Sequence, residues 1–334
     1  MKYSTSKKQT WFIKTFGCQM NVADSQRVET ALERKGLKKS KTIKEADLVV
    51  INSCIVRESA ENRVYGLLNK LKGKQVILTG CLAGWLIKNK QKLRGDYKVE
   101  IKAIEELAGF DQAQKHQGEI GYIPISNGCN NFCSYCIVPY ARGRETYRQQ
   151  VNILKDVNCA VKKGLGQIML LGQNVNSYPD FPKLVEEVAK VEGVKLLSFM
   201  SANPRNFSDK LIKVIAKRPN ISREIHIPIQ SGDNQILKAM NRGYTGQNYL
   251  SLIRKIKKTI PEAEITTDIL IGFPGETESA FQNTIKLCQK IGFKKAYLNK
   301  YSPRPGTKAS GLPDNIPPKE KKRRWQMLEK LINN

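Results

Sequence analysis

Short apolar runs in the first third of the chain alternate with longer amphipathic stretches. Leu48–Ile51 and Gln75–Leu78 are rich in apolar residues, which is typical of strands that are covered on both faces. Trp11–Phe16 predicts an earlier strand, and Val99–Ala103 predicts a weaker, later one. Because helical patterns separate these runs, we expect an N-terminal domain built on an open, mostly parallel α/β sheet.

Two helices are predicted between the first three strands. Asp24 can cap a helix that extends through Leu32, and Gly36 can end it. Apolar residues at helical spacing, from Val64 to Leu71, predict the second helix. Each helix would connect one parallel strand to the next.

A second series of strands and helices begins near residue 122. Its predicted strands are Tyr122–Ser126, Gln167–Leu171, Lys195–Met200, Glu224–Ile229, Glu264–Ile271 and Lys295–Tyr301. Helical patterns lie between them, including Val151–Lys163, Asp209–Lys217, Tyr249–Thr259 and Thr277–Ile291. Six βα repeats are too few for a closed eight-stranded barrel, so we expect a partial, open (βα)6 barrel. The predicted units are an N-terminal domain at 10–112, a barrel at 115–312 and a basic C-terminal helix at 313–334.

The charge balance indicates a polyanionic partner. Lys and Arg number 57 against 30 Asp and Glu, which gives a net charge of +27. Residues 1–112 carry 22 basic and 12 acidic side chains, and residues 113–334 carry 35 and 18. Because both parts are basic, we expect a folded protein that lies along nucleic acid, with a membrane surface as the second alternative.

The cysteine content indicates metal chemistry. No apolar run approaches the ~20 residues of a membrane span, so we expect a cytoplasmic protein without a membrane partner. Thiols stay reduced in that compartment, and the eight cysteines are expected to be ligands or catalysts rather than disulfides. Cys159 and Cys288 lie in predicted helices among apolar residues and are expected to be core side chains. His116 lies in a polar linker and is expected to have no specific role.

The strongest local motif is a C-x3-C-x2-C run, formed by Cys129, Cys133 and Cys136 directly after the first predicted barrel strand. Three thiolates on one loop can hold one metal centre, but a closed zinc site needs a fourth ligand. His116 and His226 are the two histidines of the chain, and neither has zinc-finger spacing. An iron–sulfur cluster with three protein ligands instead leaves one iron open to a substrate or cofactor.

A second set of cysteines is dispersed along the N-terminal domain. Cys18, Cys54 and Cys81 each follow one of the first three predicted strands, in polar turns. The carboxyl ends of parallel strands meet at one edge of a sheet, so we expect the three thiols to converge there. Three separate buried cysteines are the alternative, but the polar turns favour a second cluster with an open iron.

These motifs resemble the radical S-adenosylmethionine (SAM) methylthiotransferase family. The matching segments are GCQMN at 17–21, CNNFCSYCIVPYARGR at 129–144, LLGQNVNSY at 170–178, HIPIQSG at 226–232, MNRGYT at 240–245 and DILIGFPGE at 268–276. The resemblance extends from about residue 12 to the C-terminus. Six cysteines that match with their contexts make it specific for the family.

The resemblance implies SAM and two 4Fe-4S clusters as cofactors. The catalytic cluster would be held by Cys129, Cys133 and Cys136. Its open iron would chelate SAM, and reduction would cleave SAM to a 5′-deoxyadenosyl radical. The auxiliary cluster, which would carry or supply the transferred sulfur, would be held by Cys18, Cys54 and Cys81.

The resemblance also implies the reaction and the partners. Two SAM molecules would be consumed to methylthiolate C2 of N6-dimethylallyladenosine at position 37 of tRNA. The implied partners are the tRNA anticodon arm and a low-potential electron donor of the flavodoxin or ferredoxin type. The enzyme is expected to act as a monomer.

Other residues beside these motifs receive weaker roles. The candidates for SAM binding are Tyr135, Gln173, Asn174, Gln230 and Ser231. Tyr135 would pack against the adenine of SAM. Gln173 and Asn174 would bind its amino-acid moiety, and Gln230 and Ser231 would bind its ribose. Turns and core packing are the alternatives. The candidates for tRNA phosphate contacts are Arg142, Arg144, Arg242 and Arg304. Solvated surface charge is the alternative for each arginine.

The substrate has alternatives within and outside the family. Similar enzymes continue into a small β-barrel RNA-binding (TRAM) domain, whereas this chain ends at Leu331–Asn334. Threonylcarbamoyl-adenosine in tRNA is the nearest alternative substrate, and the turn with Gln19 and Met20 argues against it. The same turn disfavours an aspartate of a ribosomal protein. The intact C-x3-C-x2-C motif disfavours a non-catalytic iron–sulfur protein that binds RNA.

Overall fold

The N-terminal part of the chain folds around one five-stranded sheet. The computed structural model describes residues 9–111, 114 and 116–334. The strand order is β2-β1-β3-β4-β5, and every pairing is parallel. The strands are β1 (Thr10–Thr15), β2 (Lys38–Lys39), β3 (Leu48–Ser53), β4 (Gln75–Thr79) and β5 (Glu100–Ile101). The predicted open parallel sheet is therefore confirmed, with β2 as an additional edge strand.

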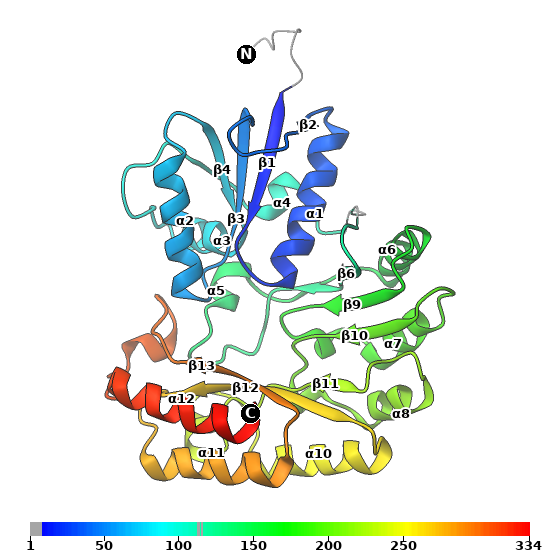
Figure 1. Cartoon of the computed structure of the whole chain (residues 1–334), viewed down its shortest axis with the longest axis vertical. Coiled ribbons are helices and arrows are strands. Elements are labelled where there is room, and N and C mark those ends of the chain that lie inside the picture. Colours follow the sequence, from blue (N-terminus) through cyan, green and yellow to red (C-terminus); the bar gives the residue numbers. More distant parts are fainter. Residues whose placement is uncertain (1–8, 112–113, 115) are drawn as a thin grey trace.

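Helices cover both faces of this sheet (Figure 1). The helices are α1 (Gln19–Arg34) and α4 (Ile104–Leu107) on one face, and α2 (Glu58–Lys70) and α3 (Gly80–Lys88) on the other. β3 is buried along its whole length because its side chains alternate between two cores. Val49 and Ile51 pack towards α2 and α3, whereas Leu48 and Val50 pack towards α1.

Helix α1 begins earlier than the sequence predicted. Cys18 is its N-cap residue, and Asp24 lies in the second turn of the helix. The Asp24 carboxylate is fully buried and forms ion pairs with Arg27 at 2.6 Å and Arg142 at 2.7 Å. The prediction of Asp24 as a helix cap was wrong, because its carboxylate is used in a tertiary contact that local sequence does not encode.

Six parallel strands form the second part of the structure. They are β6 (Ile120–Pro124), β9 (Gln167–Leu171), β10 (Leu196–Phe199), β11 (Glu224–His226), β12 (Glu264–Ile271) and β13 (Lys295–Lys300). The first three pair in the order β6-β9-β10 and the last three in the order β11-β12-β13. A bridge between Leu197 and Ile221 connects the two groups. β6 and β13 remain edge strands, which agrees with the predicted partial, open barrel.

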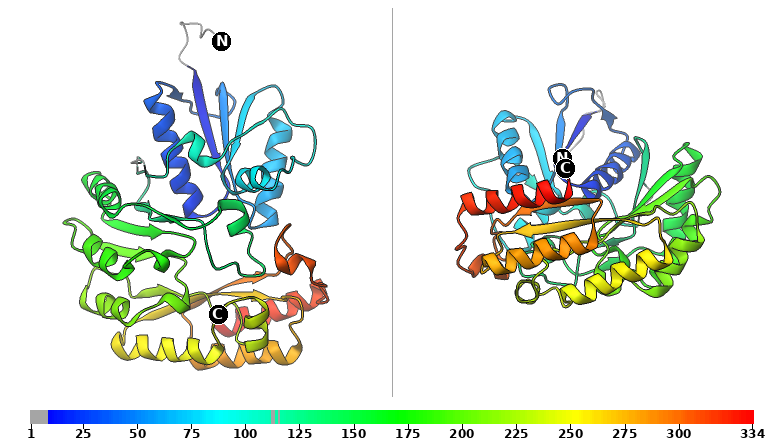
Figure 2. Two further views of the ribbon diagram at one scale, coloured as in Figure 1. Left: turned by 180° about the vertical axis from the view of Figure 1, so that it is seen from behind. Right: turned by 60° about the horizontal axis from the view of Figure 1, so that its bottom comes forward.

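Helices lie on the outer side of these strands (Figures 1 and 2). They are α6 (Gln150–Lys162), α7 (Phe181–Ala189), α8 (Asp209–Lys217), α9 (Asn234–Ala239), α10 (Gly246–Thr259), α11 (Glu278–Ile291) and α12 (Pro318–Ile332). Short 3-10 helices occur at Val175–Ser177, Pro204–Asn206 and Lys308–Gly311. Leu184, Ile212, Ile253 and Phe281 belong to one large core shared by the strands and α7, α8, α10 and α11. The last helix, α12, packs beside β13.

A small junction lies between the two parts (Figure 1). β7 (Ser126–Asn127) and β8 (Thr146–Tyr147) pair antiparallel, and helix α5 (Val138–Arg142) lies between them in sequence. α5 packs closely against α3 of the N-terminal part: a Cβ on Gly84 would lie only 2.5 Å from the carbonyl oxygen of Ala141. The strand ends of the sheet and of the barrel therefore approach each other at this junction.

Several local expectations are corrected by the structure. Cys159 lies in α6 but is exposed, so it is not a core residue, whereas Cys288 is buried as expected. His116 lies in the segment between α4 and β6, as expected, but it is buried there, and burial lowers its pKa to about 4. The predicted boundary residues 112 and 115 lie outside the described residues. Within the described part of the chain, no helix has the length and apolar character to cross a membrane.

Candidate functional site

The C-x3-C-x2-C loop follows β6 and β7 at the carboxyl end of the barrel. Cys129 and Cys133 are buried and Cys136 is half-buried. Burial and the nearby Cys133 and Cys129 thiols raise the pKa of Cys136 to about 12. The three cysteines lie on one short loop between β7 and α5, and their binding of one cluster stays a prediction.

Backbone and amide contacts fix the shape of this loop. Gly128 has a φ of +82°, and a Cβ there would lie 2.2 Å from the carbonyl oxygen of Arg144, so only glycine fits. The Gly128 N–H donates to Oε1 of Gln173 at 2.6 Å. Nδ2 of Asn241 donates to the carbonyl oxygen of Phe132 at 3.1 Å. This hydrogen bond stabilises the left-handed backbone conformation of Phe132. The loop is thus held by residues that follow two separate elements of the barrel, β9 and α9.

The second set of cysteines lies at the carboxyl edge of the N-terminal sheet. Cys18 follows β1, Cys54 follows β3, and Cys81 is in the first turn of α3 after β4. Burial, together with the Cys54 and Cys18 thiols, raises the pKa of Cys81 to about 11, although the nearby Arg142 charge lowers it. The three cysteines therefore follow the carboxyl ends of three neighbouring strands, and their convergence on one cluster stays a prediction.

Two buried asparagines organise this edge. Nδ2 of Asn21 donates to Oδ1 of Asn52 at 2.9 Å, and Nδ2 of Asn52 donates to the Asn21 carbonyl oxygen at 2.7 Å. The Cys18 thiol donates to Oδ1 of Asn21 at 3.5 Å. Gly80 has a φ of +84°, and a Cβ there would lie 2.3 Å from Oδ1 of Asn52. The turns that carry the cysteines are therefore locked to one another by close contacts.

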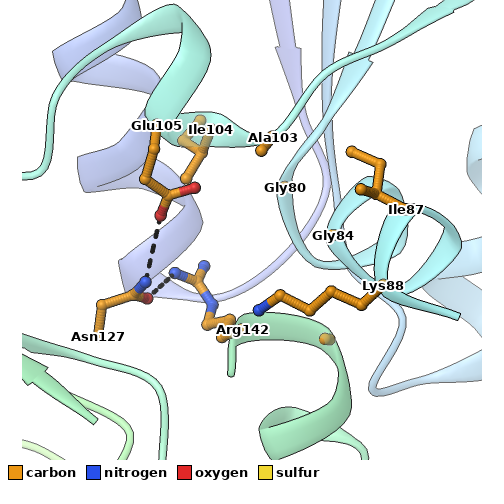
Figure 3. Close-up of a pocket in the computed structure, with 10 residues that line it drawn as sticks. Gly80, Gly84, Ile87, Lys88, Ala103, Ile104, Glu105, Asn127 and Arg142 are labelled. Atoms are coloured by element: carbon orange, nitrogen blue, oxygen red, sulfur yellow. Dashed lines mark hydrogen bonds between the residues drawn. The ribbon is translucent and has the colours of Figure 1, made fainter. Parts of the chain in front are cut away.

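Arg142 connects the second cysteine set to the barrel. Its Nε donates to Sγ of Cys81 at 3.2 Å, its Nη1 donates to Oδ1 of Asn127 at 2.8 Å, and its Nη2 donates to Asp24 at 2.7 Å. Figure 3 shows the guanidinium directed at Asn127, with Lys88 of α3 directed at the same small cavity. Although burial alone raises the pKa of Asp24, Arg142 and Arg27 outweigh it and hold that pKa below its usual value.

A cavity of about 500 Å³ lies beside Cys136, between the barrel and the N-terminal part. The barrel contributes Tyr135, Cys136, Gln230 and Asp268 to its wall, and the N-terminal part contributes the segment 56–59, directly after Cys54. Its volume is in the range of pockets that enclose small molecules. The strand ends of both parts therefore open onto one shared space.

Each cysteine set supplies three sulfur donors of the kind that binds iron–sulfur clusters. Within the described residues, no three His, Cys, Asp or Glu side chains are placed to hold one metal ion. A mononuclear zinc site requires four ligands at one centre. In a 4Fe-4S cluster each cysteine binds a different iron, so its cysteines are more widely separated. Each set of three sulfur donors is compatible with a cluster of that kind.

Gln173 and Asn174 lie beside the cluster loop but are engaged with protein groups. Gln173 accepts from Gly128, and Nδ2 of Asn174 donates to Glu145 at 2.9 Å. Oδ1 of Asn174 is buried and has no hydrogen-bond partner among the described residues. A ligand contact for Asn174 through that oxygen stays a prediction, whereas Gln173 supports the loop.

The remaining candidates for SAM binding separate into two groups. Tyr135 and Gln230 line the 500 Å³ cavity. The backbone of Gln230 has a φ of +69°, and its N–H donates to the Asp268 carbonyl oxygen at 2.8 Å. Ser231 does not line this cavity: its hydroxyl lies 3.4 Å from the hydroxyl of Thr284 in α11. The expected ribose contact of Ser231 is not supported by this position.

Three of the four arginines expected to contact phosphate are buried. Arg142 pairs with Asp24, Arg304 pairs with Glu61 of α2, and Arg242 donates to Sγ of Cys133 at 3.2 Å. Arg144 alone among the four is exposed, and its guanidinium lies 4.5 Å from the centre of the Phe132 ring. The prediction of phosphate contacts disagrees with the positions of the three buried arginines, whose side chains are used inside the protein.

Sequence reasoning did not single out several polar residues of the site. Asn52 directly follows the apolar residues Leu48–Ile51 of β3, and Asp268 directly precedes the apolar residues Ile269–Ile271 of β12. A polar side chain at the end of a buried apolar run was an available signal for both. Asp24 offered no such signal, because its partner Arg142 is distant in sequence.

Comparisons with known proteins agree with this geometry. Residues 10–100 match the uncharacterized protein family UPF0004, and residues 123–288 match the radical SAM superfamily. A tRNA-2-methylthio-N(6)-dimethylallyladenosine synthase from Caldicellulosiruptor saccharolyticus is 38% identical, and the alignment covers 99% of this chain and 79% of the relative. The protein of the same name from Fusobacterium nucleatum is 40% identical, with 96% and 83% covered.

The chain belongs to the tRNA-2-methylthio-N(6)-dimethylallyladenosine synthase family. It is accordingly a radical SAM methylthiotransferase, and membership in the radical SAM superfamily implies a 4Fe-4S cluster and SAM. The family assignment and the C-x3-C-x2-C loop thus agree.

Solved structures support the fold. The radical SAM methyltransferase TsrM from Kitasatospora setae is 14% identical with a TM-score of 0.65, over 91% of this chain and 75% of that chain. The cobalamin-dependent SAM radical enzyme OxsB is 10% identical with a TM-score of 0.57, over 97% of this chain and 56% of that chain. At these identities the similarity concerns the fold alone.

A matched pair of glycine substitutions tests the packing at the auxiliary edge. Gly36 and Gly80 have similar φ values of +80° and +84°, but a Cβ at Gly36 meets nothing within 4 Å. Gly36→Ala is expected to lower the free energy of unfolding by about 1–2 kcal/mol from backbone strain alone. Gly80→Ala adds a clash with Asn52 and Ser53, which is expected to lower the free energy of unfolding by a further ~1–3 kcal/mol. Urea denaturation of both variants measures the difference; equal losses would show that the close approach at Gly80 is unimportant.

Proposed function

We propose that this chain is a tRNA methylthiotransferase that places a methylthio group on C2 of N6-dimethylallyladenosine at position 37 of tRNA, with SAM as cosubstrate. The observation that carries the proposal is the 500 Å³ cavity bordered by Cys136 on one side and by the segment after Cys54 on the other. The names of relatives that match nearly the whole chain supply the substrate.

The roles of the two parts follow from this arrangement. Residues 10–112 would hold an auxiliary 4Fe-4S cluster through Cys18, Cys54 and Cys81, and residues 115–312 would hold the catalytic cluster through the C-x3-C-x2-C loop. The bound clusters supply the electron that cleaves SAM and the sulfur that is transferred. Residues 313–334 form the C-terminal segment beside β13.

The protein's own residues bind, orient and exclude water. Leu270, Leu298 and Tyr301 give the cavity an apolar wall suited to the dimethylallyl group. Gln230 and Asp268 place polar atoms in the same cavity, where they can orient an adenine or a ribose. The ion pair between Arg304 and Glu61 connects the two parts beside the cavity. These contacts would hold the reacting groups in one cavity, where positioning lowers the barrier to reaction.

The partners follow from charge and chemistry. The net charge of +27, distributed over both parts, is suited to a tRNA anticodon arm. A low-potential electron donor of the flavodoxin or ferredoxin type is needed for the reduction. A tRNA substrate would place the enzyme in the cytoplasm, and a monomer suffices because one chain carries both cysteine sets.

Iron content tests the two-cluster assignment. Anaerobically reconstituted protein is expected to hold about eight irons per chain. Replacing Cys18, Cys54 and Cys81 together by Ala should leave about four, and replacing Cys129, Cys133 and Cys136 should also leave about four. Cys159→Ala is the matched control, because that thiol is exposed in α6, and it should retain all eight. A maximum of four irons in the unaltered protein would show that the chain does not bind an auxiliary cluster.

Nucleoside mass spectrometry tests the reaction. tRNA from cells that lack the gene is expected to contain N6-dimethylallyladenosine without its 2-methylthio derivative. The unaltered gene should restore the derivative, and the Cys133→Ala gene should not, because the catalytic cluster loses a ligand. A change in threonylcarbamoyl-adenosine instead would identify the alternative substrate. No change in any nucleoside would favour a non-catalytic RNA-binding protein.

A further inference from the structure

Each cysteine set has one buried arginine that donates to a cysteine sulfur. In the N-terminal set, Nε of Arg142 lies 3.2 Å from Sγ of Cys81. In the barrel set, Nη1 of Arg242 lies 3.2 Å from Sγ of Cys133. The side chain of Arg142 is 7% exposed, and Arg242 is 8% exposed. Burial on this scale is rare for arginine unless its donors are paired, so both guanidiniums are built into the interior.

The other donors of each guanidinium fix its orientation. Arg142 is held by Asn127 at 2.8 Å and by Asp24 at 2.7 Å (Figure 3 includes the Asn127 contact). Arg242 donates through Nη2 to the Pro228 carbonyl oxygen at 3.2 Å and through Nε to the Tyr244 hydroxyl at 2.9 Å. Nη1 of Arg242 also donates to the Tyr135 hydroxyl at 3.5 Å. With at least two further partners on each guanidinium, the donor directed at sulfur has little freedom to turn away.

The two arginines differ in the charge around them. Arg142 shares the Asp24 carboxylate with Arg27, so its positive charge is partly balanced. Among the described residues, the hydrogen-bond partners of Arg242 are neutral oxygens and the Cys133 sulfur, and no carboxylate lies within ion-pair distance. The field of Arg242 at its cysteine is therefore less compensated than the field of Arg142 at Cys81.

We propose that Arg142 and Arg242 are positioning residues, each of which holds one ligand sulfur and raises the reduction potential of the cluster bound at that set. The inference rests on the proposed two-cluster function. Reduction adds one electron to a cluster and makes it more negative, and hydrogen bonds to cluster sulfurs stabilise the reduced form. A buried cation beside the sulfur acts in the same direction, because Coulomb interactions are strong where water is excluded.

Single-cluster proteins separate the two effects. The full-length chain with Cys129, Cys133 and Cys136 replaced by Ala reports on the auxiliary cluster, and the chain with the other three replaced reports on the catalytic cluster. Arg142→Gln and Arg242→Gln are introduced into both backgrounds. Potentiometric titration with dithionite, followed by electron paramagnetic resonance, gives each midpoint potential. Arg144→Gln is the matched control, since Arg144 lies two residues after Arg142, is exposed and contacts no cysteine sulfur in the described structure.

Each arginine is expected to affect its own cluster alone. Arg142→Gln should shift the auxiliary cluster tenfold towards the oxidised form, which is about −59 mV for one electron, and leave the catalytic cluster unchanged. Arg242→Gln should shift the catalytic cluster towards the oxidised form by a larger amount, because the charge of Arg242 is less compensated, and should leave the auxiliary cluster unchanged. Arg144→Gln should change neither potential. If a Gln variant does not fold, Arg142→Lys or Arg242→Lys takes its place, since lysine keeps the charge but lacks the planar set of donors.

The outcomes distinguish this inference from the proposed function. Clusters present at about four irons per single-cluster chain, with midpoint potentials that neither arginine changes, would overturn the inference and leave the function intact. A shift of the wrong cluster, or equal shifts of both, would also overturn it. Failure of the auxiliary background to bind iron at all, with both arginines intact, would contradict the two-cluster function itself.

Discussion

The buried ion pair between Asp24 and Arg142 is the contact on which the arrangement of the two parts depends. Asp24 lies in α1 of the N-terminal part, and Arg142 lies in α5, six residues after the last cysteine of the C-x3-C-x2-C loop. Removing Asp24 would leave the buried guanidiniums of Arg27 and Arg142 without their shared carboxylate, and loss of a partner from a buried pair typically costs about 3–5 kcal/mol. The pair therefore favours one relative position of the sheet and the barrel.

That position determines what the cysteines can do together. The carboxyl ends of β1, β3 and β4 present one set, and the loop after β6 and β7 presents the other. With α5 packed on α3, the segment 56–59 that follows Cys54 and the Cys136 side of the loop line one cavity. A reaction that needs a radical from one cofactor and a sulfur from another requires this proximity, because the reacting groups must meet in one place.

The sequence predicted the parts of the site that depend on strand order. Cys18, Cys54 and Cys81 could be placed at one edge because parallel strands align their carboxyl ends, and β9 and β12 agree with the predicted spans. The roles of Arg142 and Arg242 could not be predicted in this way. In a basic chain, arginines outside the predicted strands are expected to be surface charges. Only the folded structure shows that Asp24 lies beside Arg142 and that the Cys133 sulfur lies beside Arg242.

The most direct test of the central claim is the magnetic interaction between the two reduced clusters. One cluster would lie at Cys136, beside the cavity, and the other at Cys54, which closely precedes the cavity-lining segment 56–59, so electron paramagnetic resonance of the doubly reduced protein should show spin–spin coupling. Its spectrum should differ from the sum of the spectra of the two single-cluster proteins. A spectrum equal to that sum, with both clusters fully reduced, would contradict a shared site.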